Sequence, residues 1–247
     1  MKKVLSILYY IFFTFTAVFF IPIIILIWIL TYFVDSKLRA LHLFTQYWES
    51  FILFVIPAWK IKVKGKEKIN KSKRYVIVSN HQSEFDILLA SKLYTHFKWI
   101  SKESAFHYPI VGWVMQMNKY IALKRGDRRS IVHMIKECIQ NLNEGNSIWI
   151  FPEGTRSKTG LLRSFSSGAF VIAQKAKVGL LPVVINGTKN IQEKGAWTLN
   201  FKAEISIEVL DEIPYEEIKN KTADEIASMV HNILSQRINE HIQKNKA

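Results

Sequence analysis

The chain has 247 residues, of which 49% are hydrophobic, and 34 lysines and arginines against 20 acidic residues give a formal net charge of +14. This length fits one domain of ordinary size with an appendage. A single cysteine, Cys138, excludes a disulfide framework within the chain.

The N-terminal segment is strongly apolar. No charged residue occurs from position 4 to position 34, and about 20 apolar residues are enough for one membrane span. The segment has no small-residue cleavage site of the kind that ends a signal peptide, because Ala17 stands among bulky aromatic residues. We therefore expect a retained membrane segment, with a kink or break at Pro22.

The next segment, residues 36–59, has the pattern of an amphipathic helix, because polar and apolar residues each recur at helical spacings. Two arrangements fit: a single tilted span followed by a surface helix, or a helical hairpin inserted into one leaflet. The uncharged run is long for one span and its partner is amphipathic, so we favour the hairpin. Residues 1–58 are thus predicted to be membrane-anchoring helices.

A basic stretch follows at residues 59–74, where seven lysines and Arg74 accompany one acid, Glu67. Cationic side chains beside a membrane segment attract anionic lipid head groups. Nucleic acid, the other usual partner of basic stretches, fits poorly with a membrane anchor. The stretch predicts an anionic phospholipid membrane as partner and, with the absence of disulfides, a catalytic domain on the cytoplasmic side.

From residue 59 onward the chain alternates short strands and helices. The expected strands are residues 59–65, 74–80, 98–102, 120–125, 147–151, 180–187 and 199–210, the last near a sheet edge. The expected helices are residues 84–94, 108–117, 128–145, 164–177 and a terminal helix opened by a capping box at Thr222 and Glu225. This alternation is typical of an α/β domain, residues 59–247, with a mixed, mostly parallel sheet flanked by helices.

His81 and Asp86 stand five residues apart, where an apolar strand ends and a helix begins. Ligands of open α/β sheets bind outside the carboxyl ends of strands. Positions five apart do not share a helix face, so the side chains meet only if His81 lies in the loop and folds back over a first turn that Ser83 can cap. The carboxylate would then fix the imidazole tautomer, as in a general base with an orienting partner. The spacing alone is a weak motif.

A second loop, residues 151–157 with the sequence FPEGTRS, also follows a short apolar strand. Gly154 permits unusual backbone angles and close approach of a ligand. Backbone N–H groups together with Arg156 could hold a phosphate. Arg125, at the end of another strand, is a further candidate, although a single arginine is commonly only a surface charge. We expect these strand ends to meet at one edge of the sheet.

Several chemistries find no support in the sequence. The chain has no nucleophile elbow, phosphate-binding P-loop, dinucleotide fingerprint or zinc-protease motif. Cys138 lies in a predicted helix interior, where an inert buried thiol is the default. No group of cysteines and histidines has metal-ligand spacing, so no metal site is predicted.

These blocks together resemble the glycerolipid acyltransferases, most closely the bacterial 1-acylglycerol-3-phosphate acyltransferases. Four segments are similar in order, and the first and third are the most specific: residues 80–86, 119–125, 151–157 and 180–187. One departure lies in the second block, where Lys124 holds a position that is often acidic in the family.

The resemblance implies transfer of a fatty acyl group from an acyl thioester to the 2-hydroxyl of 1-acylglycerol 3-phosphate, giving phosphatidic acid. It implies His81 as general base, oriented by Asp86, with the substrate supplying the nucleophile. The residues implied in binding the acceptor's phosphate are Lys102, Arg125, Glu153, Gly154, Thr155 and Arg156. No cofactor is implied beyond the donor, either acyl-coenzyme A or an acyl carrier protein, and the location implied is the bacterial inner membrane.

Two other interpretations stay open at the level of sequence. The same fold could acylate glycerol 3-phosphate or another lysophospholipid, or could hydrolyse the thioester with water. Alternatively, the chain could be a non-catalytic membrane protein that binds anionic lipids through its lysines. Substitution of His81 separates an enzyme from such a binding protein.

Overall fold

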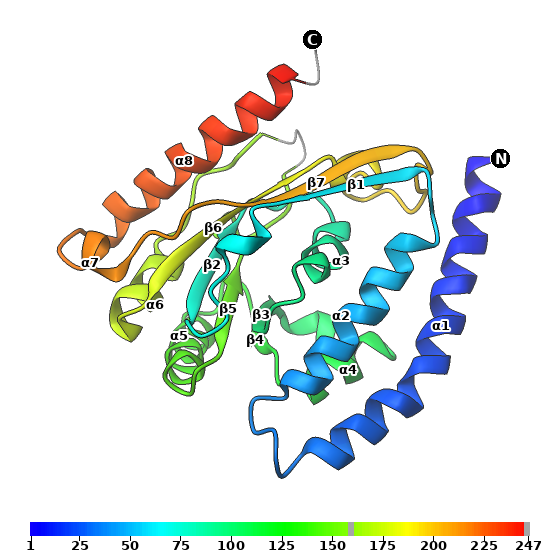
Figure 1. Ribbon diagram of the computed structural model, residues 1–247, viewed down its shortest axis with the longest axis horizontal. Helices are drawn as coiled ribbons and strands as arrows, with labels where there is room; N and C mark the ends of the chain where they lie inside the picture. Colours follow the sequence, from blue (N-terminus) through cyan, green and yellow to red (C-terminus); the bar gives the residue numbers. More distant parts are fainter. Residues whose placement is uncertain (158–160, 245–247) are drawn as a thin grey trace.

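The computed structural model describes residues 1–157 and 161–244 and places them in three layers around one sheet (Figure 1). The seven strands lie in the order β1-β7-β6-β2-β5-β3-β4, and only the β6–β7 pair is antiparallel. Their bounds are β1 Trp59–Lys64, β2 Tyr75–Ser79, β3 Phe97–Lys102, β4 Ile121–Leu123, β5 Ser147–Ile150, β6 Gly179–Asn186 and β7 Ala203–Val209. The prediction of a mixed, mostly parallel sheet is confirmed. The strand expected near an edge, β7, lies next to the edge strand β1.

Helices cover both faces of the sheet. The α-helices are α1 Lys2–Thr31, α2 Arg39–Phe54, α3 Phe85–Ala90, α4 Val111–Met117, α5 Arg128–Asn143, α6 Gly168–Ala176, α7 Tyr215–Ile218 and α8 Ala223–Lys244. Short 3₁₀ helices are η1 Lys66–Lys68, η2 Ser91–Leu93, η3 Glu103–His107 and η4 Thr188–Asn190. The first four α-helices lie on one side of the sheet and the last four on the other (Figure 1). We call these the α1–α4 layer and the α5–α8 layer.

Strand β2 illustrates how the sequence builds a sheet covered on both faces. Tyr75 and Ile77 pack into the cluster of the α1–α4 layer, whereas Val76 and Val78 pack into that of the α5–α8 layer. All five residues of the strand are buried. A parallel strand between two helical layers therefore has a continuous apolar sequence, in which apolar and polar residues do not alternate.

The two N-terminal helices form a hairpin that is part of the domain's core. Helix α1 continues through Pro22 and bends in its C-terminal half (Figure 1), and α2 packs beside it. Tyr9, Ala17 and Trp48 belong to the same hydrophobic cluster as the strands. Residues 1–58 are thus packed onto the α/β domain along much of their length and do not stand apart from it.

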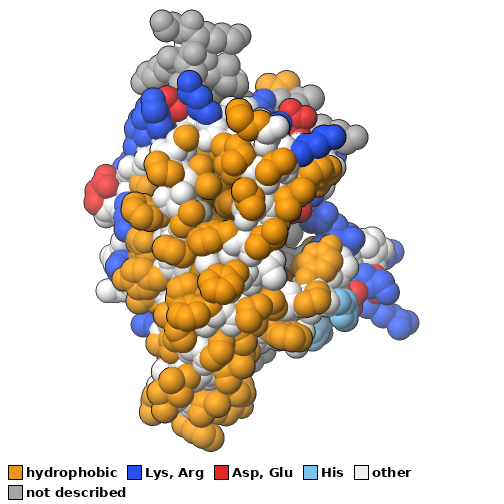
Figure 2. Space-filling view, turned by 90° about the vertical axis from the view of Figure 1, so that its right-hand side faces the viewer, with side chains coloured by type: hydrophobic (Ala, Val, Ile, Leu, Met, Phe, Trp, Pro, Cys, Tyr) orange, Lys and Arg blue, Asp and Glu red, His pale blue; other side chains and the backbone are white. Residues whose placement is uncertain are grey.

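The outer side of α1 is apolar and uncovered. Figure 2 shows hydrophobic side chains gathered on the face that α1 forms. The exposed residues of α1 include Phe15, at 69%, and Phe19, at 61%. By length and composition, α1 is the one helix in the described part of the chain that could cross a membrane.

A buried polar contact fastens the helical hairpin to the sheet. Lys98, on β3, is 2% exposed, and its Nζ donates hydrogen bonds to the carbonyls of Lys37 at 2.9 Å and Asn118 at 2.8 Å. These carbonyls lie in the α1–α2 connection and at the end of α4. Burial lowers the pKa of Lys98 to about 8, because a low-dielectric surrounding disfavours the ammonium form.

Candidate functional site

His81 lies in the loop that connects β2 to α3, at the carboxyl edge of the sheet. The preceding residue, Asn80, anchors this loop by exchanging two 2.8 Å hydrogen bonds with the backbone of Ile185 on β6. The imidazole folds back over the first turn of α3, and its Nδ1 lies 2.7 Å from Oδ2 of Asp86. The predicted meeting of these two side chains is therefore present. The helix begins at Phe85, after Glu84, so Ser83 lies one residue before the N-cap.

Asp86 is fully buried, and its carboxylate is held by several donors. Oδ2 accepts hydrogen bonds from the backbone N–H groups of Gln82 at 2.6 Å and Ser83 at 3.0 Å, and Oδ1 accepts one from the Thr188 hydroxyl at 2.5 Å. Such donors keep the carboxylate in one orientation. A proton on Nδ1 of His81 that donates to this carboxylate leaves Nε2 as an acceptor.

An aromatic wall supports the other side of the imidazole. The Phe151 ring stacks on His81 with centroids 4.0 Å apart and planes at 15°, and Trp99 stacks in turn on Phe151. The His81 side chain remains 13% exposed. Stacking thus restricts the ring to one orientation while leaving an edge open. Sequence analysis did not identify Phe151 as functional, because an aromatic residue at a strand end is ordinarily part of the core.

Glu153 joins the two loops of the site. It is 8% exposed, and its carboxylate accepts hydrogen bonds from the backbone N–H groups of His81 at 2.7 Å and Arg163 at 3.0 Å. The backbone N–H of Ser157 also donates to the His81 carbonyl at 2.9 Å. Burial raises the pKa of Glu153, and these N–H groups offset part of that rise. Both oxygens of the Glu153 carboxylate thus hold backbone groups of the site loops, and a role of Glu153 at the acceptor's phosphate stays a prediction.

The remainder of the FPEGTRS loop provides one guanidinium close to the histidine loop. Arg156 forms an ion pair with Glu84 at 3.1 Å, and 24% of its side chain is exposed. The Nζ of Lys194 donates to the Thr155 hydroxyl at 3.1 Å and to the Arg156 carbonyl at 2.9 Å. Gly154 has a φ of 67°, a conformation that favours glycine. Lys194 was missed by sequence analysis because one lysine in a loop carries no signal.

Lys102 and Arg125, two predicted phosphate ligands, lie at the same sheet edge as His81 but do not contact His81 or Arg156. Lys102 ends β3, and Arg125 follows β4 by two residues; both side chains are exposed. Within residues 1–157 and 161–244, neither forms a hydrogen bond or ion pair with His81 or Arg156. The structure therefore brings His81, Asp86 and Arg156 together and leaves Lys102 and Arg125 on neighbouring strand ends.

The nucleophile of the site does not come from the surrounding side chains that the structure describes. The nearest hydroxyls have other roles, since Ser83 donates to the Gln192 carbonyl and Thr188 donates to Asp86. Cys138 lies in α5, fully buried, and burial raises the pKa of its thiol. The arrangement is a histidine whose Nδ1 contacts a fixed carboxylate, a geometry suited to general-base chemistry on a hydroxyl that a bound molecule would bring.

The chain is similar to several known proteins. Residues 60–186 match the family model described as Acyltransferase. The chain is 42% identical over 156 residues to the 1-acyl-sn-glycerol-3-phosphate acyltransferase LPAT1, chloroplastic, of Arabidopsis thaliana, a match that covers 63% of this chain and 43% of that protein. It is 27% identical to the 1-acyl-sn-glycerol-3-phosphate acyltransferase of Haemophilus influenzae, covering 74% of this chain and 77% of that one.

The fold has a close counterpart among solved structures. The crystal structure of the 1-acyl-sn-glycerophosphate acyltransferase PlsC from Thermotoga maritima superposes with a TM-score of 0.82 at 26% identity and covers 97% of both chains. The plant relative is longer, and the matched region spans under half of it. Because the family model covers residues 60–186, more than half of the chain, the chain belongs to the Acyltransferase family.

Proposed function

We propose that the chain transfers a fatty acyl group from an acyl thioester to the 2-hydroxyl of 1-acylglycerol 3-phosphate, giving phosphatidic acid. The observation that carries this proposal is the His81–Asp86 pair, joined at 2.7 Å, beside the guanidinium of Arg156. The names of the Arabidopsis, Haemophilus and Thermotoga relatives support the same acceptor.

The proposed chemistry is a direct transfer. Nε2 of His81 accepts the proton of the acceptor's 2-hydroxyl as that oxygen bonds to the thioester carbonyl carbon. Asp86 stabilises the imidazolium through Nδ1. When the tetrahedral intermediate collapses, the carbon–sulfur bond breaks, and the departing thiolate recovers the proton from His81. Because the acceptor supplies the nucleophile, the step uses no acyl-enzyme, and we propose that it needs no metal or cofactor beyond the donor.

Arg156 is the proposed ligand for the acceptor's phosphate. A guanidinium binds phosphate through charge-assisted, commonly bidentate hydrogen bonds. Arg156 forms an ion pair with Glu84, and 66% of the Glu84 side chain is exposed. We propose that phosphate replaces this carboxylate, and that Lys102 and Arg125 add positive charge from neighbouring strand ends. Gly154 and Thr155 shape the loop beneath the phosphate.

The N-terminal helices are proposed to hold this site at a membrane surface. Ser6, Tyr9, Ala17 and Ile24 of α1 are all buried, so the helix lies along the domain for most of its length. A helix packed in this way would draw the α/β domain into the hydrocarbon if it crossed the bilayer. We therefore propose that α1 lies within one leaflet with its apolar side outward, and that the basic residues at 59–74 bind anionic lipids on the cytoplasmic side, in bacteria that of the inner membrane.

The test is an acceptor comparison with purified protein in detergent. Labelled acyl-coenzyme A is offered with 1-acylglycerol 3-phosphate, with unphosphorylated 1-acylglycerol, with glycerol 3-phosphate, or alone. The proposal predicts labelled phosphatidic acid in the first reaction and little product in the others. Free fatty acid without any acceptor would identify a hydrolase, and a better rate with another acceptor would overturn the proposed substrate.

A further inference from the structure

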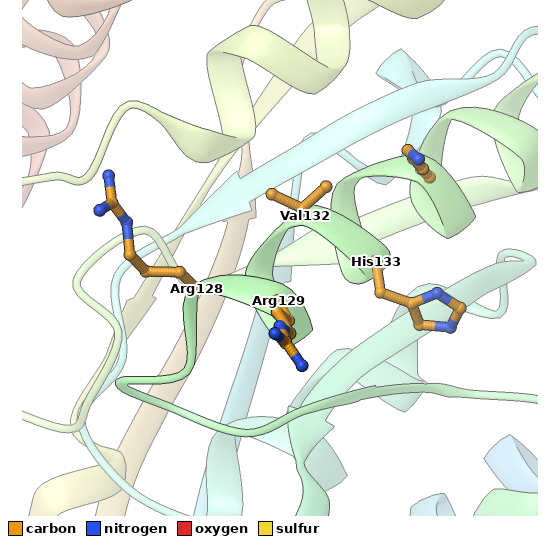
Figure 3. A pocket seen from close by; sticks show the side chains of 5 residues that line it. Arg128, Arg129, Val132 and His133 are labelled. Carbon is orange, nitrogen blue, oxygen red and sulfur yellow. The ribbon is translucent and has the colours of Figure 1, made fainter.

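The exposed side of α5 carries a cationic surface that the proposed reaction does not use. Arg128, Arg129, His133 and Lys136 surround Val132 and line an open hollow of about 380 Å³ (Figure 3). We call this set of five residues the α5 face. Val132 is 53% exposed, so the face combines an apolar centre with a positively charged rim.

Helical spacing explains why these side chains share one face. Arg129, Val132, His133 and Lys136 follow the i, i+3, i+4, i+7 pattern of a single helix stripe. Met134, Cys138 and Leu142 point to the opposite side, where they are buried in the cluster of the α5–α8 layer. The stripe is therefore left free for contact with another molecule.

The three cations of the α5 face, Arg128, Arg129 and Lys136, outnumber the two acids beside them, Asp127 and Glu137. Arg128, Arg129 and Lys136 form no ion pair with any residue that the structure describes. The two nearby acids are engaged locally: Asp127 accepts hydrogen bonds from the backbone N–H groups of Arg129 and Ser130, and Glu137 lies 3.8 Å from His133. A concentration of one sign of charge raises the rate at which an oppositely charged partner associates.

The position of the α5 face limits the direction from which a partner can approach. Helix α5 begins at the sheet edge where β4 ends, the same edge that carries His81. Strands β5 and β3 separate β2 from β4, and three strand spacings amount to about 14 Å. The face also belongs to the α5–α8 layer, on the opposite side of the sheet from α1 and α2 (Figure 1). A partner at this face thus approaches from water, near the site, and away from the proposed membrane surface.

These features favour an acidic protein over a lipid head group or a small molecule. The hollow is open, and its rim of long, separated cationic side chains suits a broad acidic surface, for which charge complementarity guides association. A carrier protein presents its acyl thioester on a long, flexible arm, which can cover the lateral distance to His81. We propose that the α5 face docks an acidic acyl carrier protein that delivers the acyl group to this site. This inference rests on the proposed function and assigns its donor.

The experiment compares two double variants with equal changes in charge. The double variant Arg129→Glu, Lys136→Glu replaces two positive charges of the α5 face with negative ones. Lys175→Glu with Lys221→Glu is the matched control, because both lysines are exposed in the same helical layer. The two lysines lie near each other, since the side-chain amide of Gln174, next to Lys175, donates a hydrogen bond to the Lys221 carbonyl. Each protein is assayed with acyl carrier protein and with acyl-coenzyme A as donor. Binding of acyl carrier protein is measured separately by fluorescence anisotropy, without acceptor.

The expected result is a fall of about tenfold or more in binding and in kcat/KM with the carrier protein for the α5-face variant. Its rate with acyl-coenzyme A stays at the wild-type value, and the control variant behaves as wild type with both donors. Equal losses with both donors, or carrier binding unaffected by the α5-face variant, would overturn the inference. The anisotropy measurement needs no turnover, so it tests docking even if the protein transfers no acyl group. Failure of acyl transfer with both donors would count against the proposed function.

Discussion

Nδ1 of His81 lies 2.7 Å from Oδ2 of Asp86, across a sharp fold of the chain between β2 and α3. Three further donors hold the carboxylate, so it is fixed before any substrate binds. In the proposed reaction this pairing determines which imidazole nitrogen carries the proton. The relationship between the two residues thus leaves Nε2 as the nitrogen that can accept a proton from a substrate.

Asp86→Asn should lower kcat by about a hundredfold or more, within the usual range for a disabled general base. The amide oxygen should stay on the backbone N–H groups of Gln82 and Ser83 and on Nδ1, but the neutral amide no longer offsets the positive charge of the imidazolium that forms in the reaction. Thr188→Val is the control, because it removes one hydrogen bond to Asp86 and leaves the charge in place. Steady-state kinetics measures both variants, and a smaller loss is expected for Thr188→Val. Equal activity of Asp86→Asn and wild type would show that the pair has no catalytic role.

Glu153→Gln tests the role of Glu153 as a positioning residue. One accepting oxygen becomes an NH₂ group that faces a backbone N–H, so the free energy of unfolding should fall by about 1–3 kcal/mol. Because the His81 loop loses an anchor, kcat should fall while the acceptor KM stays near that of wild type. Denaturant unfolding and acceptor titration measure the two effects. A rise in acceptor KM with unchanged kcat would instead place Glu153 at the phosphate.

Arg156→Ala should lower kcat/KM for 1-acylglycerol 3-phosphate by roughly 10- to 100-fold, the value of about 1.5–3 kcal/mol for a hydrogen bond to a charged group. Glu84→Gln should not weaken acceptor binding, because it frees the Arg156 guanidinium from its carboxylate partner. The affinity for the acceptor should be equal to that of wild type or tighter. Acceptor titrations at constant donor concentration measure both. If Arg156→Ala leaves the acceptor KM unchanged, another cation binds the phosphate.

The buried lysine makes stability depend on pH. The pKa of Lys98 is about 8 in the folded chain and about 10.4 when exposed. Between these values the unfolded chain binds more protons, so the free energy of unfolding rises with pH. Relative to Lys98→Met, which lacks the titrating group, wild type should gain stability on the order of 3 kcal/mol from pH 7 to 10.

Denaturant unfolding of both proteins in detergent measures this difference at each pH. The two carbonyls that Lys98 contacts lose their donor in the variant at every pH, so they shift the difference without giving it a slope. A difference in stability that does not vary over this interval would mean that Lys98 titrates as an exposed lysine.

Orientation in the membrane can be tested with cysteines at the two ends of α1. Lys3→Cys and Ser36→Cys, each in a Cys138→Ala background, place one exposed thiol in the first turn of the helix and one after its end. If α1 lies within one leaflet, a membrane-impermeant thiol reagent should label both from the same side of sealed vesicles. Labelling from opposite sides would mean that α1 spans the bilayer.

The elements that sequence analysis predicted best are those whose pattern is set by burial on two faces or by local capping. Residues 75–79 form a continuous apolar run because helices cover both sides of β2. The capping box at Thr222 is present, with its backbone N–H 2.6 Å from the Glu225 carboxylate. The position of β7 beside β1 and the packing of α1 on the domain depend on contacts between distant segments, which no local pattern encodes.

In the candidate site, too, some residues could be predicted from the sequence and others could not. His81, Asp86 and Arg156 were predicted correctly as neighbours because strand ends converge at one edge of a parallel sheet. The two backbone N–H groups that Glu153 accepts could not be predicted, because they belong to residues far apart in the sequence. Phe151 and Lys194 were missed, since their roles arise from stacking and from a contact between separate loops.

The most direct test of the central claim is acyl transfer to 1-acylglycerol 3-phosphate by purified wild type and His81→Ala. Both labelled acyl-coenzyme A and labelled acyl carrier protein serve as donors, and circular dichroism verifies that the variant is folded. The account predicts labelled phosphatidic acid from wild type and a loss of about a hundredfold to ten-thousandfold in the variant, the range of general acid–base catalysis. A His81→Ala protein that transfers acyl groups at the wild-type rate would contradict the account.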